Sequence, residues 1–399
     1  MTLLWGILFS LIGVGVVKLF WVAGFSVGVV NRGSQRSTRD LDRRSAYLIQ
    51  QVVDQPVNWR ERLASRLWMR YLPEQFRSEW ALVTHSMTAA CLTNLAFLRP
   101  EGQPSAQLQV ERLIERVRRP VIKAFDTKQW GIDPLDDLNG ERGHIGYLGH
   151  LNFMLAAYHT LGGSHPELRS LFTSVSVHLA GVLHGQPSVH GETYPGETYI
   201  PDNAVAVASL AIYDRLYPAE DTGVPRAWLD ALNDGRRDPD SDLPVFSLDE
   251  RGLPLAMSRG SACAWTIFYL GYIDVTVAQA DYERLRKHFW RSYAPGLAAI
   301  DEYLGGKGDE SHDFVRFDPD CGPLLWGMSP AATGFAIAGA RFAGDLEGER
   351  QLVRTAEMAG FSVQWGRRRR YATAPLVGNA ILPAMRSATT WDERWATRV

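Results

Sequence analysis

The chain contains little cysteine and almost no net charge. Its 399 residues include only three cysteines, Cys91, Cys263 and Cys321, which are too far apart for a disulfide framework and lack CxxC metal spacing. This cysteine usage is typical of a reducing compartment. The formal net charge of −2 provides no overall field that would attract nucleic acid. We therefore expect no nucleic-acid partner.

Long apolar runs are also scarce, and the one clear example lies at the N-terminus. Between Leu3 and Val30 the only charged side chain is Lys18, and the run is long enough to cross about 30 Å of hydrocarbon. No basic residue precedes the run and no clear A-x-A site follows it, which favours a transmembrane helix over a cleaved signal peptide. A buried core helix is the alternative.

Basic residues cluster directly after this run, and such flanks tend to remain in the cytoplasm. The sequence therefore predicts a single-pass protein of the cell inner membrane with the bulk of the chain on the cytoplasmic side, in contact with membrane lipid through the N-terminal helix. The cluster consists of Arg32, Arg36, Arg39, Arg43 and Arg44.

Two kinds of helix alternate along the rest of the chain. Six segments are rich in small apolar residues on all sides, which is typical of buried helices: 84–98, 144–161, 203–217, 261–274, 329–342 and 374–385. The first five are each followed by an amphipathic segment, which is typical of an outer helix: 107–125, 166–184, 225–234, 278–290 and 347–360. The buried segments recur at intervals of about 60 residues.

This repeat predicts an all-α fold, an (α/α)6 toroid of six helical hairpins preceded by one N-terminal transmembrane helix. Residues 42–53 would supply the sixth outer helix. The predicted organisation is an anchor over residues 1–31, a linker with peripheral helices over 32–77, and the toroid over 78–399. An open α-solenoid is the alternative, because solenoids also stack helix pairs.

In a toroid, the loops before the buried helices would meet at one mouth, and helix N-termini present unpaired N–H groups there. The loop from His190 to Asn203 is the richest in polar residues. A carboxylate beside two phenols is a candidate general acid or base, so we assign Glu197 and Tyr199 to catalysis and Tyr194 to substrate binding. Asp202 and Asn203 are either substrate ligands or simple helix caps.

Three further loops supply candidates. His144 would act in catalysis with Tyr147 and His150 as substrate ligands, although a histidine at a helix start is often only structural.

The loop from Asp313 to Gly327 contains Asp318 and Asp320, a like-charge pair that could keep one carboxyl protonated or form a surface turn. We assign Asp320 to catalysis and Asp318 and Trp326 to substrate binding, and interpret Cys321 as an inert buried thiol. Arg259 stands at another inner-helix start, where it would bind an anion or pair with one of these aspartates.

The only dense basic block is Arg367–Arg370, before the last buried segment. Because anionic headgroups lie close to a tethered domain, we interpret the block as a solvated or lipid-facing patch rather than as an RNA-binding site.

Several short motifs between His144 and Met385 resemble the linalool dehydratase/isomerase-like domain family. They are Gly143-His144-Ile145-Gly146-Tyr147-Leu148-Gly149-His150, Pro201-Asp202-Asn203 with Tyr213-Asp214, and Asp320-Cys321-Gly322-Pro323. The resemblance implies an (α/α)6 fold with a central pocket, and cofactor-free removal of water and isomerisation of an alcohol by acid/base residues that include cysteines. This chain departs from that pattern, because no cysteine occurs between Tyr194 and Tyr217.

These observations predict a membrane-anchored enzyme that performs acid/base chemistry, without metal or cofactor, on a small, partly apolar alcohol or isoprenoid-like substrate. Two alternatives remain open. A carbohydrate-processing enzyme would use paired carboxylates such as Glu197 and Asp320. A non-catalytic membrane-bound binding or scaffold module would have the ring centre filled by side chains. The sequence is compatible with an oligomer.

Overall fold

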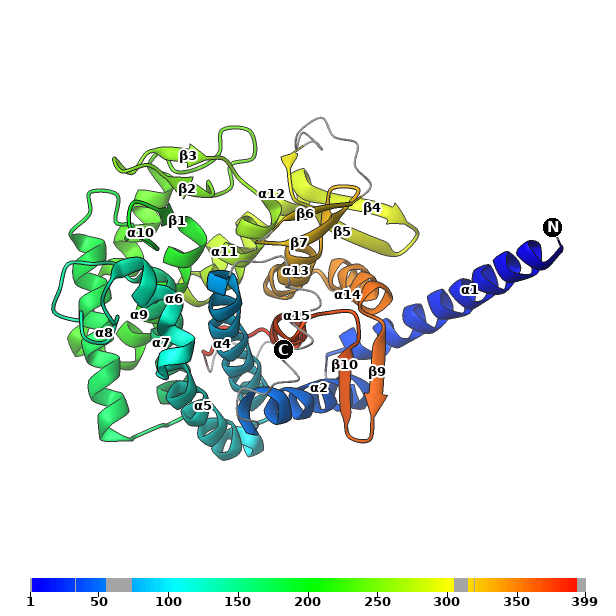
Figure 1. The fold of residues 1–399 in the computed structure, drawn as a ribbon, viewed down its shortest axis with the longest axis horizontal. Coiled ribbons are helices and arrows are strands. Elements are labelled where there is room, and N and C mark those ends of the chain that lie inside the picture. Colours follow the sequence, from blue (N-terminus) through cyan, green and yellow to red (C-terminus); the bar gives the residue numbers. More distant parts are fainter. Residues whose placement is uncertain (1, 33, 55–73, 305–314, 319, 393–399) are drawn as a thin grey trace.

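The computed structural model describes residues 2–32, 34–54, 74–304, 315–318 and 320–392 (Figure 1). This part of the chain is mostly helical and carries three small antiparallel sheets. A long N-terminal helix projects from a rounded body (Figure 1).

Six buried helices contact one another in a closed sequence. Each contacts the next along the chain, and the last, α15, contacts the first, α4. Almost every side chain of α7, α9 and α11 is buried, as their lack of a polar face predicts. The six helices are α4 (Glu74–Leu98), α7 (Ile145–Thr160), α9 (Ile200–Leu216), α11 (Gly260–Ile273), α13 (Pro330–Ala343) and α15 (Leu376–Arg386).

Amphipathic helices pack outside them. Each of five contacts the buried helix that precedes it: α5 (Gln103–Val117), α8 (Pro166–His184), α10 (Val224–Asn233), α12 (Val275–Phe289) and α14 (Leu346–Gly360). The sixth position, against α15 and α4, is occupied by α2 (Gln35–Leu48), which continues into a π-helical turn over Ile49–Asp54.

One predicted outer helix is divided in two. The segment 107–125 was expected to be continuous, but α5 ends at Val117 and α6 (Pro120–Trp130) begins at Pro120. Proline lacks the N–H that a continuous helix would need and is well suited to a first helical position. Two short 3₁₀ turns, Pro100–Gly102 and Pro218–Glu220, complete the helical elements of the described chain.

The β-strands correct the expectation of an almost wholly helical body. The largest sheet has the order β4-β5-β8-β7-β6 and falls in the longest interval between buried helices, so the segment 313–327, expected as a loop, contains strands. Its strands are β4 (Trp290–Ala294), β5 (Leu297–Asp301), β6 (Val315–Asp318), β7 (Gly322–Leu325) and β8 (Met328–Ser329). A second sheet joins β1 (Thr198–Tyr199), β2 (Ser247–Leu248) and β3 (Pro254–Ala256), and a hairpin pairs β9 (Ser362–Trp365) with β10 (Arg368–Tyr371).

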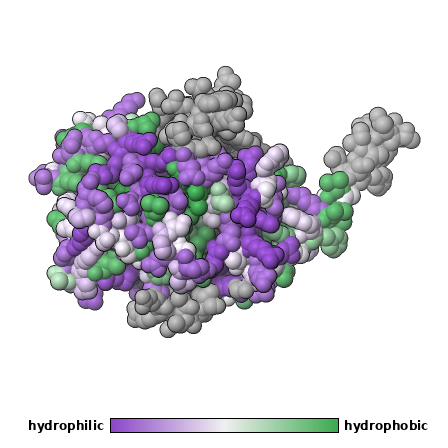
Figure 2. Space-filling model, turned by 90° about the horizontal axis from the view of Figure 1, so that it is seen from below, coloured by the Kyte–Doolittle hydropathy of each residue, from purple (hydrophilic) through white to green (hydrophobic). Residues whose placement is uncertain are grey.

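The N-terminal helix α1 (Thr2–Val30) leaves the body beside α14 (Figure 1). Its segment Ile12–Val30 is apolar enough to span a membrane and is only 22% buried, and its described part forms a hydrophobic surface that stands out from the body (Figure 2). The segment Ser78–Leu98 of α4 passes the same test of length and composition, but it is 83% buried and serves as a core helix.

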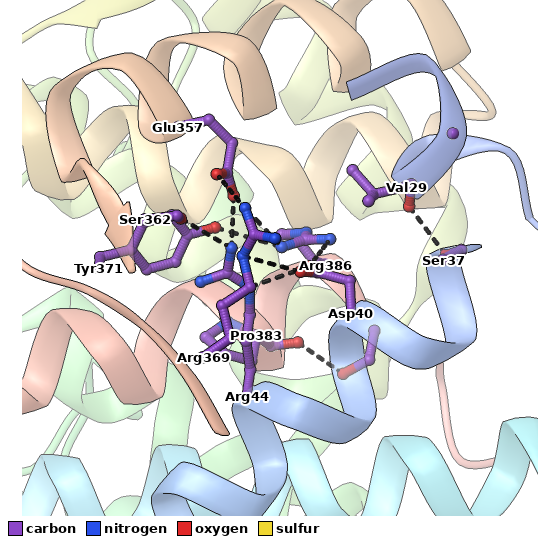
Figure 3. Close-up of polar contacts among 12 residues, drawn as sticks. Val29, Ser37, Asp40, Arg44, Glu357, Ser362, Arg369, Tyr371, Pro383 and Arg386 are labelled. Carbon is purple, nitrogen blue, oxygen red and sulfur yellow. Dashed lines mark hydrogen bonds and ion pairs between the residues drawn. The ribbon is translucent and has the colours of Figure 1, made fainter. Parts of the chain in front are cut away.

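A buried ion cluster joins α2 to the last part of the chain (Figure 3). Arg44 contacts Asp40 at 2.9 Å and Glu357 of α14 at 2.5 Å. Arg386 of α15 reaches Asp40 at 2.7 Å, and Arg369 of β10 reaches Asp40 at 3.2 Å and Glu357 at 3.4 Å. All five side chains are buried. Four separate elements therefore depend on one another for charge compensation.

The pKa of Asp40 shows that the neighbouring arginines compensate its buried negative charge. Burial alone would raise this pKa, but the positive charges of Arg386, Arg44 and Arg369 outweigh it and hold the pKa below its ordinary value. Asp40 is therefore ionised at neutral pH.

We expect Glu357→Gln to destabilise the protein by about 3–5 kcal/mol, because it leaves buried arginines without a counter-charge. The free energy of unfolding would be measured by urea titration in detergent. Glu347→Gln on the same helix is the matched control: Glu347 is 55% exposed in its pair with Arg350, and its loss should cost less than about 1 kcal/mol. Equal stability of the two variants would contradict a structural role for the cluster.

Candidate active site

The loop before α9 is folded against the helix start by one buried amide. Asn203 accepts a hydrogen bond from the Gly191 N–H at 2.8 Å and donates to the carbonyl oxygens of Gly191 at 3.0 Å and Tyr199 at 2.8 Å. All of its side-chain contacts are therefore to the backbone, and its role is to shape the loop. This corrects its assignment as a substrate ligand.

Asp202 lies in the first turn of α9 and accepts a hydrogen bond from the Thr193 hydroxyl at 3.1 Å. Burial of its carboxyl group raises its pKa to about 7, and the negative charge of Asp320 contributes to the rise. A carboxylic acid at this position is therefore partly protonated at neutral pH.

A second protonated carboxyl comes from Glu79, in the first half of α4. Burial raises its pKa to about 8, and the charges of Asp202, Asp320 and Glu197 add to the rise, while a hydrogen bond from Tyr194 lowers it. Both carboxyls therefore titrate near neutrality and influence one another.

Glu79 was not among the predicted site residues, because the apolar pattern that predicts this helix starts at Thr84, after the charged first turns of α4. The signal that could have found it is helical spacing: Glu79 stands two turns before Ser86, on the same side of α4, and Ser86 contacts His150 of α7.

Asp320 approaches the same carboxyls from the turn between β6 and β7. The turn is ordered by Asp318, whose carboxylate accepts from the N–H groups of Asp320 at 2.8 Å and Cys321 at 3.2 Å. Burial and the neighbouring charge of Asp318 raise the pKa of Asp320. Its side chain remains 48% exposed, so it forms the outer part of the group.

Arg259 holds this turn in place. Its guanidinium contacts Glu302 at 2.9 Å, Asp318 at 2.7 Å and Asp320 at 3.3 Å. Burial raises the pKa of Asp318, but the charge of Arg259 and the backbone hydrogen bonds lower it more. All three nitrogens of the guanidinium contact carboxylates, so Arg259 fixes the positions of these acidic side chains. Of the two roles predicted for it, anion binding and pairing with an aspartate, the structure matches the second.

Glu197 and Tyr199 form the exposed edge of the cluster. The Tyr199 hydroxyl donates to the Glu197 carboxylate at 2.8 Å, and its ring packs against Phe246 with centroids 5.1 Å apart. Burial and the nearby negative charges of Glu197, Asp320 and Asp202 raise the pKa of Tyr199 above its ordinary value, so it acts only as a neutral phenol.

Beneath the carboxyls lies an aromatic layer. The indole N–H of Trp265 donates to the Pro201 carbonyl at 3.1 Å, and its ring packs on Phe335 at 4.9 Å and edge-on to His150 at 5.7 Å. Burial lowers the pKa of His150 to about 3, so its ring is neutral. His150 therefore contributes an uncharged ring to this layer. Its Nδ1 lies 2.9 Å from the Ser86 hydroxyl.

His144 does not join this group, which corrects its assignment as a catalytic residue. Its side chain is fully buried, with Nδ1 at 2.6 Å from Asp126 and Nε2 at 3.3 Å from Asp137. With both ring nitrogens engaged, the side chain ties the preceding loop to the start of α7. Tyr147 is equally buried and donates to the Val117 carbonyl at 3.1 Å, so it belongs to the core rather than to a binding surface.

One further candidate, Trp326, also lies outside the cluster, whereas Cys321 is the buried thiol that the sequence predicts. Trp326 is 60% exposed in the turn between β7 and β8, where its carbonyl accepts from Arg291 at 2.7 Å. Cys321 is buried, and burial raises the pKa of its thiol, so it is not a thiolate nucleophile at neutral pH. Within the described residues, no group of three or more His, Cys, Asp or Glu side chains is arranged to hold a metal ion.

The raised pKa values of Glu79 and Asp202 predict that stability falls with rising pH. Both groups bind protons more tightly in the folded state than in the unfolded chain, so the free energy of unfolding should decrease from about pH 4.5 to about pH 8 and then level off. We expect Glu79→Gln to flatten this decrease in urea titrations at a series of pH values. Glu115→Gln, at an exposed position of α5, should retain the slope of the unmodified protein. A Glu79→Gln variant with an unchanged slope would show that Glu79 ionises at an ordinary pH.

Comparison of the chain with models of known protein families gives no match. The resemblance to the linalool dehydratase/isomerase-like family therefore depends on the short motifs themselves. Two of them, Pro201-Asp202-Asn203 and Asp320-Cys321-Gly322-Pro323, contribute Asp202 and Asp320 to the carboxyl cluster. The third, which begins at Gly143, places His144 in hydrogen-bond contact with Asp126 and Asp137, away from that cluster, and His150 in the aromatic layer beside Trp265.

Proposed function

We propose that the body is an (α/α)6 toroid whose centre carries an active site. The closed sequence of contacts among the six buried helices supports this arrangement, as does the position of α2 against both α15 and α4. In such a ring, segments far apart in the chain meet at one end, which accounts for the proximity of Glu79, Asp202 and Asp320.

The proposed reaction is acid/base removal of water from, or isomerisation of, a small, partly apolar alcohol. The observation that carries this proposal is the pair Glu79 and Asp202, whose pKa values of about 8 and about 7 allow one carboxyl to be protonated while the other is ionised near neutral pH. A protonated and an ionised carboxyl are the two partners that such a reaction needs.

In the dehydration step, Glu79 donates its proton to the substrate hydroxyl, the C–O bond breaks and water leaves. The Asp202 carboxylate removes a proton from the adjacent carbon, and the electron pair of that C–H bond becomes the new double bond. Asp202 is then protonated and Glu79 ionised, so transfer of one proton from Asp202 to Glu79 restores the starting state. In an isomerisation, the departed water would instead add to a different carbon of the allylic cation and return a proton to Glu79, which gives an isomeric alcohol.

The surroundings fit an apolar substrate with one hydroxyl. Trp265, which donates to the Pro201 carbonyl, and Phe335 would offer aromatic surface next to Asp202, while the hydroxyls of Tyr194 and Tyr199 would orient an oxygen. The negative charge of Asp320 contributes to the raised pKa values of Glu79 and Asp202. The motif resemblance to the linalool dehydratase/isomerase-like family supports the same class of reaction.

Carbohydrate processing is the second candidate, since a protonated and an ionised carboxyl are also the requirement of a glycosidase. It would place the general acid at Glu79 rather than at Glu197. Assays of the purified protein with terpenoid alcohols and with oligosaccharides separate the two reactions, and turnover of neither would favour a non-catalytic binding module.

We expect Glu79→Gln and Asp202→Asn each to lower kcat by about 10²–10⁴-fold on the active substrate, because each removes one proton-transfer group. The pH profile of kcat should be bell-shaped, rising near pH 7 and falling near pH 8 as the pair titrates. Glu192→Gln, in the loop that precedes α9, is the matched control and should keep kcat within about twofold. Unchanged turnover in Glu79→Gln would remove Glu79 from the mechanism.

We further propose that α1 anchors the protein in the cell inner membrane with the body in the cytoplasm. The basic residues Arg32, Arg36 and Arg39 directly after α1 support this orientation. Alkaline phosphatase fused after Val399 should be inactive, because it is active only in the periplasm, whereas a green fluorescent protein at the same position should fluoresce. Phosphatase activity would reverse the orientation.

A further inference from the structure

The β9–β10 hairpin stands at the base of α1. The Lys18 ammonium lies 4.3 Å from the centre of the Phe361 ring, directly before β9, and donates to the Met358 carbonyl at 2.9 Å. Arg369 of β10 lies over the Phe25 ring of α1 at 4.1 Å. The hairpin therefore contacts α1 on the same stretch where the helix joins the body.

This junction leaves no spacer between the membrane helix and the body. The described contacts of α1 with the body begin at Lys18, and the twenty residues from Thr2 to Trp21 rise about 30 Å, which is the thickness of the hydrocarbon core. Phe20 and Trp21, which are 75% and 49% exposed, would then lie at the interface, where aromatic side chains are favoured. A hairpin whose Arg369 packs on Phe25, one turn beyond Trp21, would then lie at the depth of the lipid headgroups.

The exposed surface of the hairpin combines large apolar and basic side chains, which suit the headgroup region of a bilayer. Trp365 is 87% exposed and Phe361 is 53% exposed, although both are large apolar side chains. Arg367, Arg368 and Arg370 are exposed around them.

The patch is also free of acidic neighbours in sequence. No acidic residue occurs between Glu357 and Asp392, and Glu357 itself is buried in the ion cluster. The space-filling view shows hydrophilic side chains gathered on this face near the base of α1 (Figure 2).

Strand alternation divides the four arginines between two roles. Arg369 points inward to Asp40 and Glu357, whereas its neighbours in β10 point outward. This restricts the interpretation of Arg367–Arg370 as a solvated or lipid-facing patch to three of its arginines, because Arg369 is buried. The buried contact fixes the hairpin to the body, so its outward arginines are presented on a rigid support.

We propose that the β9–β10 hairpin is a second membrane contact, which binds anionic lipid headgroups through Arg367, Arg368 and Arg370 and inserts Trp365 into the interface. The inference rests on the proposed membrane anchorage of α1. A basic patch with an aromatic residue also suits nucleic acid, but its continuity with α1 favours lipid, and the overall net charge of −2 disfavours nucleic acid. With two attachment points, the body would keep one orientation relative to the bilayer.

The test uses the full chain carrying Gln364→Cys in β9, labelled with a nitroxide, in nanodiscs of phosphatidylcholine with or without phosphatidylglycerol. The three native cysteines are buried, so the label reports on the hairpin. We expect the label to be accessible to oxygen and protected from a water-soluble relaxation agent only when phosphatidylglycerol is present.

Replacing Arg367, Arg368 and Arg370 by glutamine should lower the ratio of docked to undocked hairpin by about a hundredfold, at about fivefold per arginine. Trp365→Ser should lower it independently. The matched control replaces three exposed arginines elsewhere, Arg119, Arg226 and Arg251, and should leave the ratio unchanged.

Two outcomes would overturn the docking alone: incorporation of the protein into nanodiscs with a label that stays exposed to water, or immobilisation of the label by an added oligonucleotide instead of by lipid. Failure of the full chain to enter nanodiscs would overturn the anchorage of α1 and this inference with it. A Trp365→Ser protein that docks as well as the unmodified chain would overturn the role of the tryptophan.

Discussion

The burial of Asp40 and Glu357 among three arginines is the constraint on which the arrangement of the N-terminal and C-terminal parts depends. These charges could not be buried separately, because an unpaired buried ion is very costly. The third arginine charge is accommodated by Tyr371, whose ring lies 3.9 Å from the Arg44 guanidinium and whose hydroxyl accepts from Arg386 at 3.2 Å. The cluster therefore holds α2 beside α15, and α2 in turn contacts the apolar N-terminal helix α1 where it joins the body.

The candidate site reverses this balance of charge. In the ion cluster, arginines outnumber carboxylates and lower the pKa of Asp40. Around Glu79 and Asp202, carboxyls are close to one another, and the guanidinium of Arg259 is paired with Glu302, Asp318 and Asp320. Similar burial thus produces a permanently ionised acid in one place and acids that exchange protons near neutral pH in the other. The difference comes from the supply of positive charge, and it is what suits the second group to acid/base chemistry.

Much of this architecture is visible in local patterns. The helix α8 begins and ends where its amphipathic repeat predicts, and α7, α9 and α11 were recognised because their apolar residues cover every face. Asp202 and Asp320 were also named as candidates from their loops, and both lie near enough to Glu79 for their charges to raise its pKa. The strands of the largest sheet were missed because they are short and do not alternate clearly, as in Leu297–Asp301, where four consecutive residues are buried.

Local patterns could not tell His144 from Glu79. Both stand near the start of a buried helix, but His144 contacts Asp126 and Asp137, whereas Glu79 lies near Asp202 and Asp320. Hydrophobic periodicity is a property of residues that are close in the sequence, which is why the buried helices, the apolar N-terminal helix and the outer amphipathic helices could be predicted. Burial of a side chain, and its electrostatic interactions with residues distant in the sequence, arise only after the helices have packed. These two effects determine the pKa values of Glu79 and Asp202. Packing likewise determines that Arg369 is buried while its neighbours in β10 are exposed.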